Sequence, residues 1–172
     1  MNQTPSATAL PVRDVVRVVI IRDDDKVCLC KKPAEGSALV WITLPGGGVE
    51  PGDTHVETVI KECMEEVGML VRGVTPLNLV TLSPGEVNRT ERKGKFSAIS
   101  TTYYLAVFKK MDASLLGHDE DAMQYEWVSI SDAIKAVQKG PYSVFTEGRV
   151  QALRAAQALV CGFTKGSNDY AA

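Results

Sequence analysis

A glycine-rich loop followed by an acidic, amphipathic segment occupies residues 44–70, and it constrains this chain more than any other stretch. Thr54 and Glu57 have the spacing of a capping box, and Gly68 stands where helices often end in a left-handed residue. The stretch therefore predicts a tight loop that leads into a helix. The apolar residues of this helix recur at helical spacing and should share one buried face: Val56, Val59, Ile60, Cys63 and Val67.

Three carboxylates are expected on another face of the same helix. Glu62, Glu65 and Glu66 occupy positions i, i+3 and i+4, so their side chains are neighbours. Carboxylates packed in this way repel one another unless water or a cation surrounds them. Hard divalent cations such as Mg²⁺ take oxygen ligands of this kind together with substrate phosphates. Acidic residues on a solvated helix face are also common, so these residues alone do not establish a metal site.

The loop excludes two common nucleotide-binding motifs. The glycines at 46–48 are not followed by the Lys-Ser/Thr pair of a Walker A loop, and Pro51 stands where a dinucleotide-binding fingerprint has its third glycine. Taken together, however, the loop and the helix resemble the Nudix box, GX5EX7REUXEEXGU, in which U is a bulky apolar residue. The matching positions are Gly47, Glu62, Cys63, Glu65, Glu66, Gly68 and Met69.

Two positions depart from the family pattern. Asp53 stands where the family has Glu, and Lys61 stands where it has Arg. In the family these two residues form a salt bridge that braces the loop against the helix. Asp53 and Lys61 keep both charges, although Lys lacks the bidentate fork of Arg. We therefore expect the two residues to preserve this supporting ion pair.

The resemblance implies a hydrolase acting on acid anhydrides, a pyrophosphatase that cleaves a nucleoside diphosphate linked to another moiety. Its partner is then a small nucleotide diphosphate, and a homodimer is expected by analogy with many members. The implied cofactor is Mg²⁺, with Mn²⁺ as an alternative. The implied metal ligands are the carbonyl of Gly46 and the carboxylates of Glu62, Glu65 and Glu66.

Catalysis is expected to use Glu65 and Glu66 together with a general base, which the family takes from the box or from a downstream loop. A base must reach the attacking water within about 3 Å, directly or through hydrogen bonds. Glu120, in an acidic loop, is our candidate, and Glu86 and Glu91 are its rivals. A run of charges is also typical of a solvated loop.

The substrate depends on residues outside the box. Ser83-Pro84-Gly85 resembles the proline signature of ADP-ribose pyrophosphatases and favours ADP-ribose or another nucleotide sugar, although Pro-Gly is also common turn chemistry. One alternative is a (deoxy)nucleoside triphosphate, as in nucleotide-pool sanitation. Another is a Nudix-like domain that binds a nucleotide without hydrolysing it. The intact set of box glutamates favours the enzyme, because binding-only relatives often lose them.

Length and composition indicate one globular domain. The chain has 172 residues, and we expect a flexible tail over 1–13, a single domain over 14–163 and a frayed end over 164–172. A net charge of -2 and a pI near 5.7 argue against a general nucleic-acid binder or a membrane-surface protein. Neither a membrane-spanning apolar run nor a secretory signal is visible, so we expect a cytoplasmic protein with reduced cysteines.

The remaining pattern mixes strands with helices. Cys28 and Cys30 lie two apart in the strand expected over 26–31, so they should face the core together. A helix capped by Ser131 should end near Lys139, and a last helix should cover 145–161. This mixture suits an α/β or α+β sandwich, and the resemblance implies the Nudix arrangement, a mixed β-sheet with helices on both sides. Strands are expected over 14–22, 26–31, 39–43, 76–82, 98–109 and 124–129.

Overall fold

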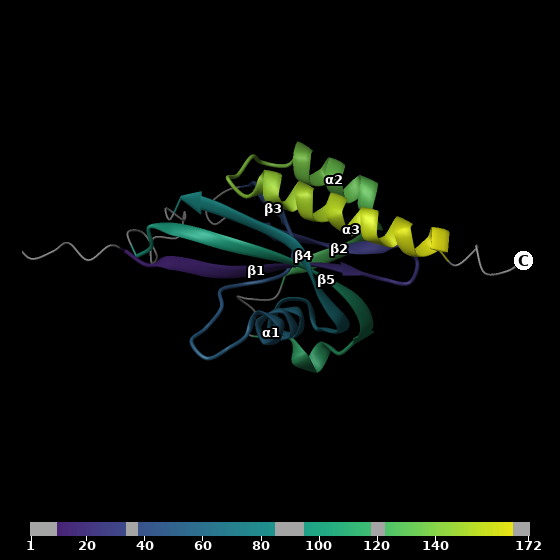
Figure 1. Ribbon diagram of the computed structural model, residues 1–172. Helices are drawn as coiled ribbons and strands as arrows, with labels where there is room; N and C mark the ends of the chain where they lie inside the picture. Colours follow the sequence, from purple (N-terminus) through teal and green to yellow (C-terminus); the bar gives the residue numbers. More distant parts are fainter. Residues whose placement is uncertain (1–9, 34–37, 85–94, 118–122, 167–172) are drawn as a thin grey trace, which may run out of the picture.

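A mixed β-sheet between two layers of helices forms the protein (Figure 1). The computed structural model describes residues 10–33, 38–84, 95–117 and 123–166. Helix α1 (His55–Val67) covers one face of the sheet, and helices α2 (Ile130–Lys139) and α3 (Thr146–Gly166) cover the other. This is the α/β sandwich that the sequence predicted. Within the described residues, no helix is long and apolar enough to cross a membrane.

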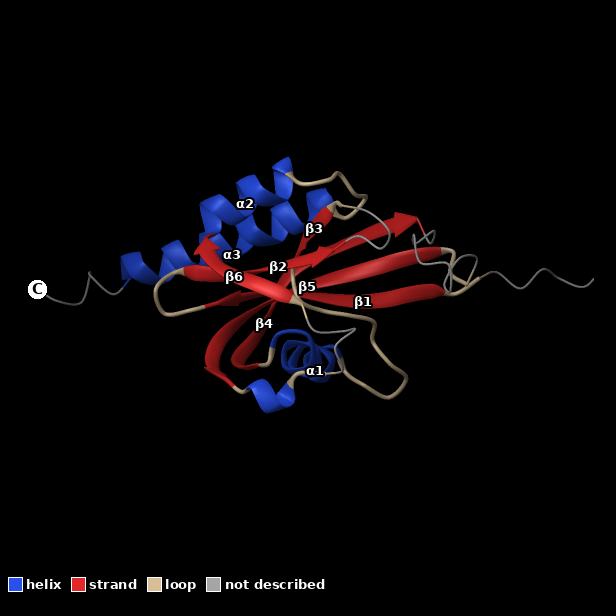
Figure 2. Ribbon diagram, turned by 180° about the vertical axis from the view of Figure 1, so that it is seen from behind, coloured by secondary structure: helices blue, strands red, loops and turns tan. Residues whose placement is uncertain are grey.

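The sheet has six strands in the described part of the chain. Their order is β3-β2-β1-β5-β4, and β6 pairs with β2 (Figure 2). β1 and β5 run parallel to each other, whereas the other paired strands are antiparallel. The strands are β1 (Val12–Ile21), β2 (Lys26–Pro33), β3 (Val40–Thr43), β4 (Met69–Pro84), β5 (Ala98–Met111) and β6 (Gln124–Ser129), with a short 3₁₀ helix, η2 (Ala113–Leu115), after β5.

Strand β1 is buried on both faces because helices cover both sides of the sheet. One hydrophobic cluster contains the buried side chains of α1, and the other contains those of α2 and α3. Cys28 and Cys30 join the cluster of α1 and are buried, as the sequence predicted. Alternate residues of β1 enter the two clusters: Val16, Val18 and Ile20 on the side of α1, and Val19 and Ile21 on the other side.

The glycine loop lies against β1. β2 pairs with β1 only close to the turn that joins them, and backbone groups of the loop pair with β1 further along. Val18 N donates to Pro45 O at 3.0 Å, and Val16 N donates to Gly47 O at 2.9 Å. The backbone of a central strand therefore holds the loop in place just before the chain enters α1.

Helix α1 begins and ends where the sequence predicted. Glu57 N donates to Thr54 Oγ1 at 3.2 Å and Thr54 N donates to Glu57 Oε2 at 2.8 Å, which completes the capping box. Gly68 ends the helix in the left-handed region with φ 62°. These local contacts set both ends of the helix that carries the box glutamates.

The buried face of α1 differs from the predicted one. Val56 is 42% exposed, because His55 faces the sheet in the first turn. The His55 ring lies 2.6 Å from Asp14 Oδ2 and 3.0 Å from the hydroxyl of Tyr104. The buried face is thus rotated toward the glutamates, and Glu66 is half-buried rather than solvated.

Strand β4 begins earlier than predicted. The sequence predicted a start at Pro76, but Gly68 turns the chain directly into the strand, and Met69 pairs with Met111 of β5. Pro76 lies inside β4 without breaking it, because β4 is at the edge of the sheet and one side of its backbone needs no partner strand.

Helix α2 is capped by a different serine from the one predicted. Ser129 Oγ accepts a hydrogen bond from Asp132 N at 3.1 Å. Ser131, the predicted cap, is already inside the helix, and its hydroxyl lies 3.0 Å from Ser129 Oγ. The helix starts two residues earlier because β6 ends at Ser129 and leads into it without a loop.

Candidate active site

Glu66 is joined to the glycine loop. Gly46 N donates a hydrogen bond to Glu66 Oε2 at 2.8 Å. Burial raises the pKa of Glu66 to about 7, and the nearby charge of Glu62 adds to this rise. The positive charge of Arg17 and the N–H of Gly46 oppose the rise, because both favour the ionised carboxylate. The helix, the loop and β1 therefore meet at this one side chain.

Glu62 reaches the same loop one turn earlier in α1. A Cβ on Gly47 would overlap Glu62 Oε1, so only glycine lets the carboxylate come this close. Gly46 has φ +135°, and a Cβ there would overlap the carbonyl oxygen of Val16. The loop thus requires glycine at 46 for its backbone shape, and glycine at 47 leaves room for the observed position of the Glu62 carboxylate.

The oxygen atoms gathered here suit a hard divalent cation. Within the described residues, no group of three His, Cys, Asp or Glu side chains is arranged to hold a metal ion. Mg²⁺, however, is usually held by one or two carboxylates, with water and substrate phosphates as further ligands. Glu62 and Glu66 converge on Gly46 and Gly47, and a cation would remove the repulsion between them. The residues present therefore fit Mg²⁺ or Mn²⁺.

Glu65 lies beside these two glutamates on the surface of α1. Its side chain is half-buried, and its backbone carbonyl accepts a hydrogen bond from Gly117 N at 2.9 Å. Its negative charge contributes to the raised pKa of Lys61, although the charge of Glu50 is the larger cause. Of the predicted metal ligands, the structure thus brings Glu62, Glu66 and the backbone of Gly46 together at the loop.

Lys61 pairs with a residue that the sequence did not single out. Its Nζ lies 3.4 Å from Glu50 Oε2, where the sequence predicted an ion pair with Asp53. Among the described charges that raise the pKa of Lys61, Asp53 is the weakest. The Asp side chain is shorter than the Glu of the family pattern, and the longer Glu50 reaches the lysine instead. The ion pair that braces the loop against the helix is therefore present, with Glu50 in place of Asp53.

Glu120 lies outside the described residues, as do the rival bases Glu86 and Glu91. The residues that flank Glu120 three positions away are described, and both are tied to the box helix. Gly117 N donates to Glu65 O at 2.9 Å, and Met123 N donates to Glu66 O at 2.8 Å. The described residues Gly117 and Met123 are therefore both held at the last turn of α1.

Arg17 is a site residue that sequence reasoning missed. Its Nη1 donates to the carbonyl of Leu44 at 3.3 Å and also to the carbonyl of Gly46. It therefore holds the two ends of the bend that contains Pro45. The available signal was a single charged residue in the otherwise apolar run 15–21.

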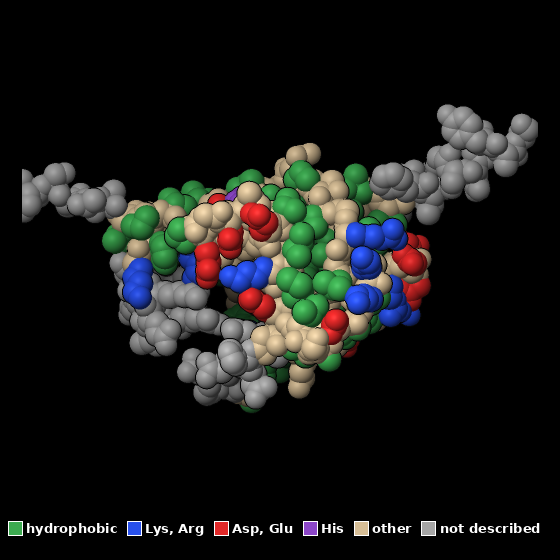
Figure 3. Space-filling view, turned by 90° about the horizontal axis from the view of Figure 1, so that it is seen from below, with side chains coloured by type: hydrophobic (Ala, Val, Ile, Leu, Met, Phe, Trp, Pro, Cys, Tyr) green, Lys and Arg blue, Asp and Glu red, His purple; other side chains and the backbone are tan. Residues whose placement is uncertain are grey.

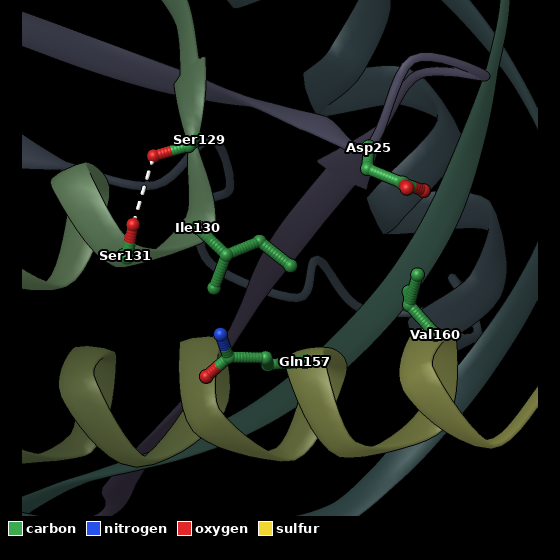
Figure 4. A pocket seen from close by; sticks show the side chains of 6 residues that line it. All are labelled: Asp25, Ser129, Ile130, Ser131, Gln157 and Val160. Carbon is green, nitrogen blue, oxygen red and sulfur yellow. Dashed lines mark hydrogen bonds between the residues drawn. The ribbon is translucent and has the colours of Figure 1, made fainter. Parts of the chain in front are cut away.

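The box glutamates and a pocket between β6, α2 and α3 lie in different layers of the molecule. Acidic side chains gather on the face that α1 covers (Figure 3). A pocket in the other layer lies where β6 leads into α2, opposite α3 (Figure 4). No box residue lines it, and the hydroxyl of Ser129 there already caps α2. Its lining residues are Asp25, Ser129, Ile130, Ser131, Gln157 and Val160.

A family model, the NUDIX domain, matches residues 11–147. This chain belongs to the Nudix family. The match runs from β1 through α2, so it covers the glycine loop, α1 and all six strands that the structure describes. It confirms the resemblance to the Nudix family that the box residues indicated.

Two Nudix relatives match part of the chain. YvcI of Bacillus subtilis (strain 168), named as a Nudix hydrolase, is 38% identical over 52 residues, which are 30% of this chain and 30% of YvcI. NUDT18 of Mus musculus, named as an 8-oxo-dGDP phosphatase, is 35% identical over 65 residues, which are 38% of this chain and 20% of NUDT18. The matches thus span well under half of either relative.

Solved Nudix structures share the fold. A NUDIX hydrolase from Nitrosomonas europaea has a TM-score of 0.64 at 19% identity and covers 86% of this chain and 89% of its own. A MutT of Aliivibrio salmonicida or Vibrio cholerae has a TM-score of 0.57 at 18% identity and covers 85% of this chain and 98% of its own. An ADP compounds hydrolase has a TM-score of 0.59 at 20% identity and covers 87% of this chain and 74% of its own. At these identities the likeness shows the fold alone.

Proposed function

We propose that this Nudix protein is a pyrophosphohydrolase that requires Mg²⁺ or Mn²⁺ and acts on a nucleoside polyphosphate, with a (deoxy)nucleoside di- or triphosphate as the best candidate. One observation carries the proposal. Glu62 and Glu66 converge on Gly46 and Gly47, where the backbone of Gly46 requires glycine and the missing Cβ of Gly47 leaves room for Glu62. Such a convergence of acids has little structural value without a cation, because it places like charges side by side in a partly buried site.

The charges of this site suit cleavage of a phosphoanhydride. A diphosphate carries dense negative charge that repels a nucleophilic water. A bound divalent cation supplies positive charge against the phosphate oxygens and lowers the pKa of water. Glu62, Glu66 and the carbonyl of Gly46 are the groups that would hold it. Arg17 maintains the bend of the loop through the carbonyls of Leu44 and Gly46, and a carbonyl oxygen has two lone pairs, so it can serve both partners.

Glu120 is the proposed general base. Gly117 and Met123 are anchored on the backbone of Glu65 and Glu66, and Glu120 is three residues from each anchor. The described residues on both sides of Glu120 are thus held at the box helix. This supports Glu120 as the candidate, because a general base must reach the water that attacks the substrate.

The relatives favour a nucleoside di- or triphosphate over ADP-ribose. NUDT18 is named as an 8-oxo-dGDP phosphatase, and a MutT shares the fold. ADP-ribose remains the second candidate, because Ser83 and Pro84 end β4 in the position of the proline signature and an ADP compounds hydrolase also shares the fold.

A substrate panel tests the proposal. The purified protein is assayed in Mg²⁺ and in Mn²⁺ with (deoxy)nucleoside di- and triphosphates, their 8-oxo-guanine forms and ADP-ribose, and released monophosphate, phosphate and pyrophosphate are measured. We expect the highest kcat/KM for a di- or triphosphate. A preference for ADP-ribose would replace the first candidate by the second, and no hydrolysis of any member would contradict the proposed activity.

A further inference from the structure

Arg149 is a buried cation in the first turn of α3. It is 8% exposed. Its Nη1 donates to Ile42 O at 3.1 Å and to Ser143 Oγ at 3.4 Å, and its guanidinium lies 5.9 Å from the centre of the Phe145 ring. Its Nε is buried and, in the described part of the chain, has no hydrogen-bond partner. Arginines are almost never buried to this extent unless they are paired.

A second guanidinium lies near Arg149. Burial lowers the pKa of Arg149 to about 10, and the positive charge of Arg17 lowers it further. Arg17 donates to the carbonyls of Leu44 and Gly46, which are neutral groups. None of the ion pairs between described residues includes either arginine. The two guanidinium groups thus bind carbonyls two residues apart, Ile42 and Leu44, and in the described part of the chain Arg149 has no carboxylate bonded to it, whereas the charge of Arg17 acts on Glu66.

A purely structural role explains only part of this arrangement. Arg149 does tie β3, through Ile42, to the connection between α2 and α3, through Ser143. That tie satisfies Nη1 but leaves Nε without a partner, and among the described residues no ion pair compensates the charge of Arg149. A buried charge of this kind is costly unless a counter-ion and hydrogen bonds satisfy it. The arrangement is thus suited to a group that is both negatively charged and rich in acceptors.

We propose that Arg149, with Arg17 beside it, binds a phosphate group of the substrate. The planar fork of a guanidinium matches phosphate oxygens in pairs, and the N-terminal end of α3, where Arg149 lies, favours an anion. Arg17 links this site to the carbonyl of Gly46, so the phosphate would lie next to the one that a cation at the box glutamates would hold. The inference rests on the proposed function, and it assigns the second phosphate of a polyphosphate substrate.

The connection between α2 and α3 that contacts Arg149 has exposed residues. Tyr142 is 81% exposed and Val144 is 53% exposed, and they flank Ser143, which contacts the guanidinium. A neutral nucleobase edge would offer acceptors to Nε but no charge, which is why we assign a phosphate here.

Binding of inorganic pyrophosphate to the metal-free protein tests the assignment. Titration calorimetry in EDTA compares the wild type with Arg149→Met, Arg149→Lys and Arg154→Met, the last being an exposed arginine on the same helix. We expect Arg149→Met to raise the Kd for pyrophosphate at least about tenfold. Arg149→Lys should give an intermediate Kd, because it keeps the charge and loses the fork, and Arg154→Met should match the wild type. A wild-type Kd in Arg149→Met would overturn the proposal.

Thermal unfolding separates binding from folding. Arg149→Met removes a buried charge that has no ion pair within the described residues, so its Tm without ligand should equal or exceed that of the wild type. Pyrophosphate should raise the Tm of the wild type and of Arg154→Met but not that of Arg149→Met. A lower Tm for Arg149→Met, together with no effect of pyrophosphate on the wild type, would make Arg149 a structural tie and overturn the proposal.

Kinetics distinguish a substrate phosphate from a free one. With the best nucleotide substrate, Arg149→Lys should raise KM about tenfold or more and change kcat much less. An unchanged KM would assign the site to free phosphate or pyrophosphate and overturn its role toward substrate. If pyrophosphate binds through Arg149 but no nucleotide is hydrolysed, the proposed function fails while the anion site stands.

Discussion

Opposing effects on the pKa of Glu66 make the charge of this side chain sensitive to a nearby cation. Burial and the charge of Glu62 favour its protonated form, whereas the charge of Arg17 and the N–H of Gly46 favour the ionised form. The balance leaves the pKa of Glu66 at about 7. Strongly perturbed acids of this kind concentrate at functional sites. A divalent cation at the loop would shift the balance to the ionised side, as catalysis requires.

Glu66→Gln should reduce Mg²⁺-dependent turnover by orders of magnitude. The glutamine oxygen can still accept the hydrogen bond from Gly46 N, so the loop should keep its place, but the negative charge toward the cation is lost. Circular dichroism should show an unchanged fold. Glu147→Gln, an exposed acid in the first turn of α3, is the matched control and should retain full activity. Equal turnover in the two variants would rule out Glu66 as a ligand.

The pH dependence of the free energy of unfolding should reveal the ionisation of Glu66. Because burial raises the pKa of Glu66 to about 7 from a usual value of 4.5, the folded protein holds a proton that the unfolded chain releases between these values. This group therefore lowers the free energy of unfolding as the pH rises through that window. In EDTA, the wild type should lose stability relative to Glu66→Gln by at most about 3 kcal/mol between about pH 5 and pH 8.

Urea unfolding of both proteins across this range measures the difference. Gln cannot ionise, so the variant lacks this contribution, and the two curves of unfolding free energy against pH should converge at the acid end. Curves that run parallel over the whole range would mean that Glu66 keeps an ordinary pKa in the folded protein.

At the scale of the element, the two serines at the start of α2 make a matched pair. Ser129 Oγ accepts the hydrogen bond of Asp132 N, whereas Ser131 lies within the helix. Ser129→Ala should therefore lower the free energy of unfolding by about 1 kcal/mol. Ser131→Ala should lower the free energy of unfolding by less than about half of this amount, because Ala has a higher helix propensity than Ser. Denaturant midpoints measure both, and a larger loss for Ser131→Ala would contradict the observed cap.

Elements whose signals are local were predictable from the sequence. The capping box at Thr54 and the helix end at Gly68 depend on neighbours along the chain, and both agree with the structure. The cap of α2 was misplaced because two serines compete within three residues, and only the end of β6 decides between them. The start of β4 at Met69 depends on pairing with Met111, which no local pattern reveals.

Contacts between distant residues account for the rest of the site. Lys61 has acids at both 50 and 53 in its sequence neighbourhood, and only the folded loop brings Glu50 to it. Arg17 contacts Leu44 and Gly46, which are 27 and 29 residues away in the sequence. Arg149 contacts Ile42, which is 107 residues away. The box singled out the acids that the structure brings to the loop, whereas the contacts of Arg17 with the loop emerge only from the tertiary structure. The boundaries of the domain at 14 and 163 stay a prediction.

At the scale of the whole molecule, the predicted metal ligands come from two layers. Glu62 and Glu66 belong to α1, which covers one face of the sheet. Gly46 belongs to a loop that is hydrogen-bonded along β1, in the sheet itself. A cation held by both would connect the helix to the sheet at the loop. Its binding energy should therefore appear in the stability of the entire fold.

Addition of Mn²⁺ or Mg²⁺ should raise the melting temperature of the wild type. A ligand present at about a hundredfold excess over its Kd adds roughly 2.7 kcal/mol to the free energy of unfolding, which for a chain of this size is a rise of about 5 °C or more. Glu66→Gln should lose most of this rise, and Glu147→Gln should keep it, because only the first removes a group at the loop. Differential scanning calorimetry in EDTA and in excess metal measures each rise. An equal rise in all three proteins would show that the ion binds elsewhere than at the glycine loop.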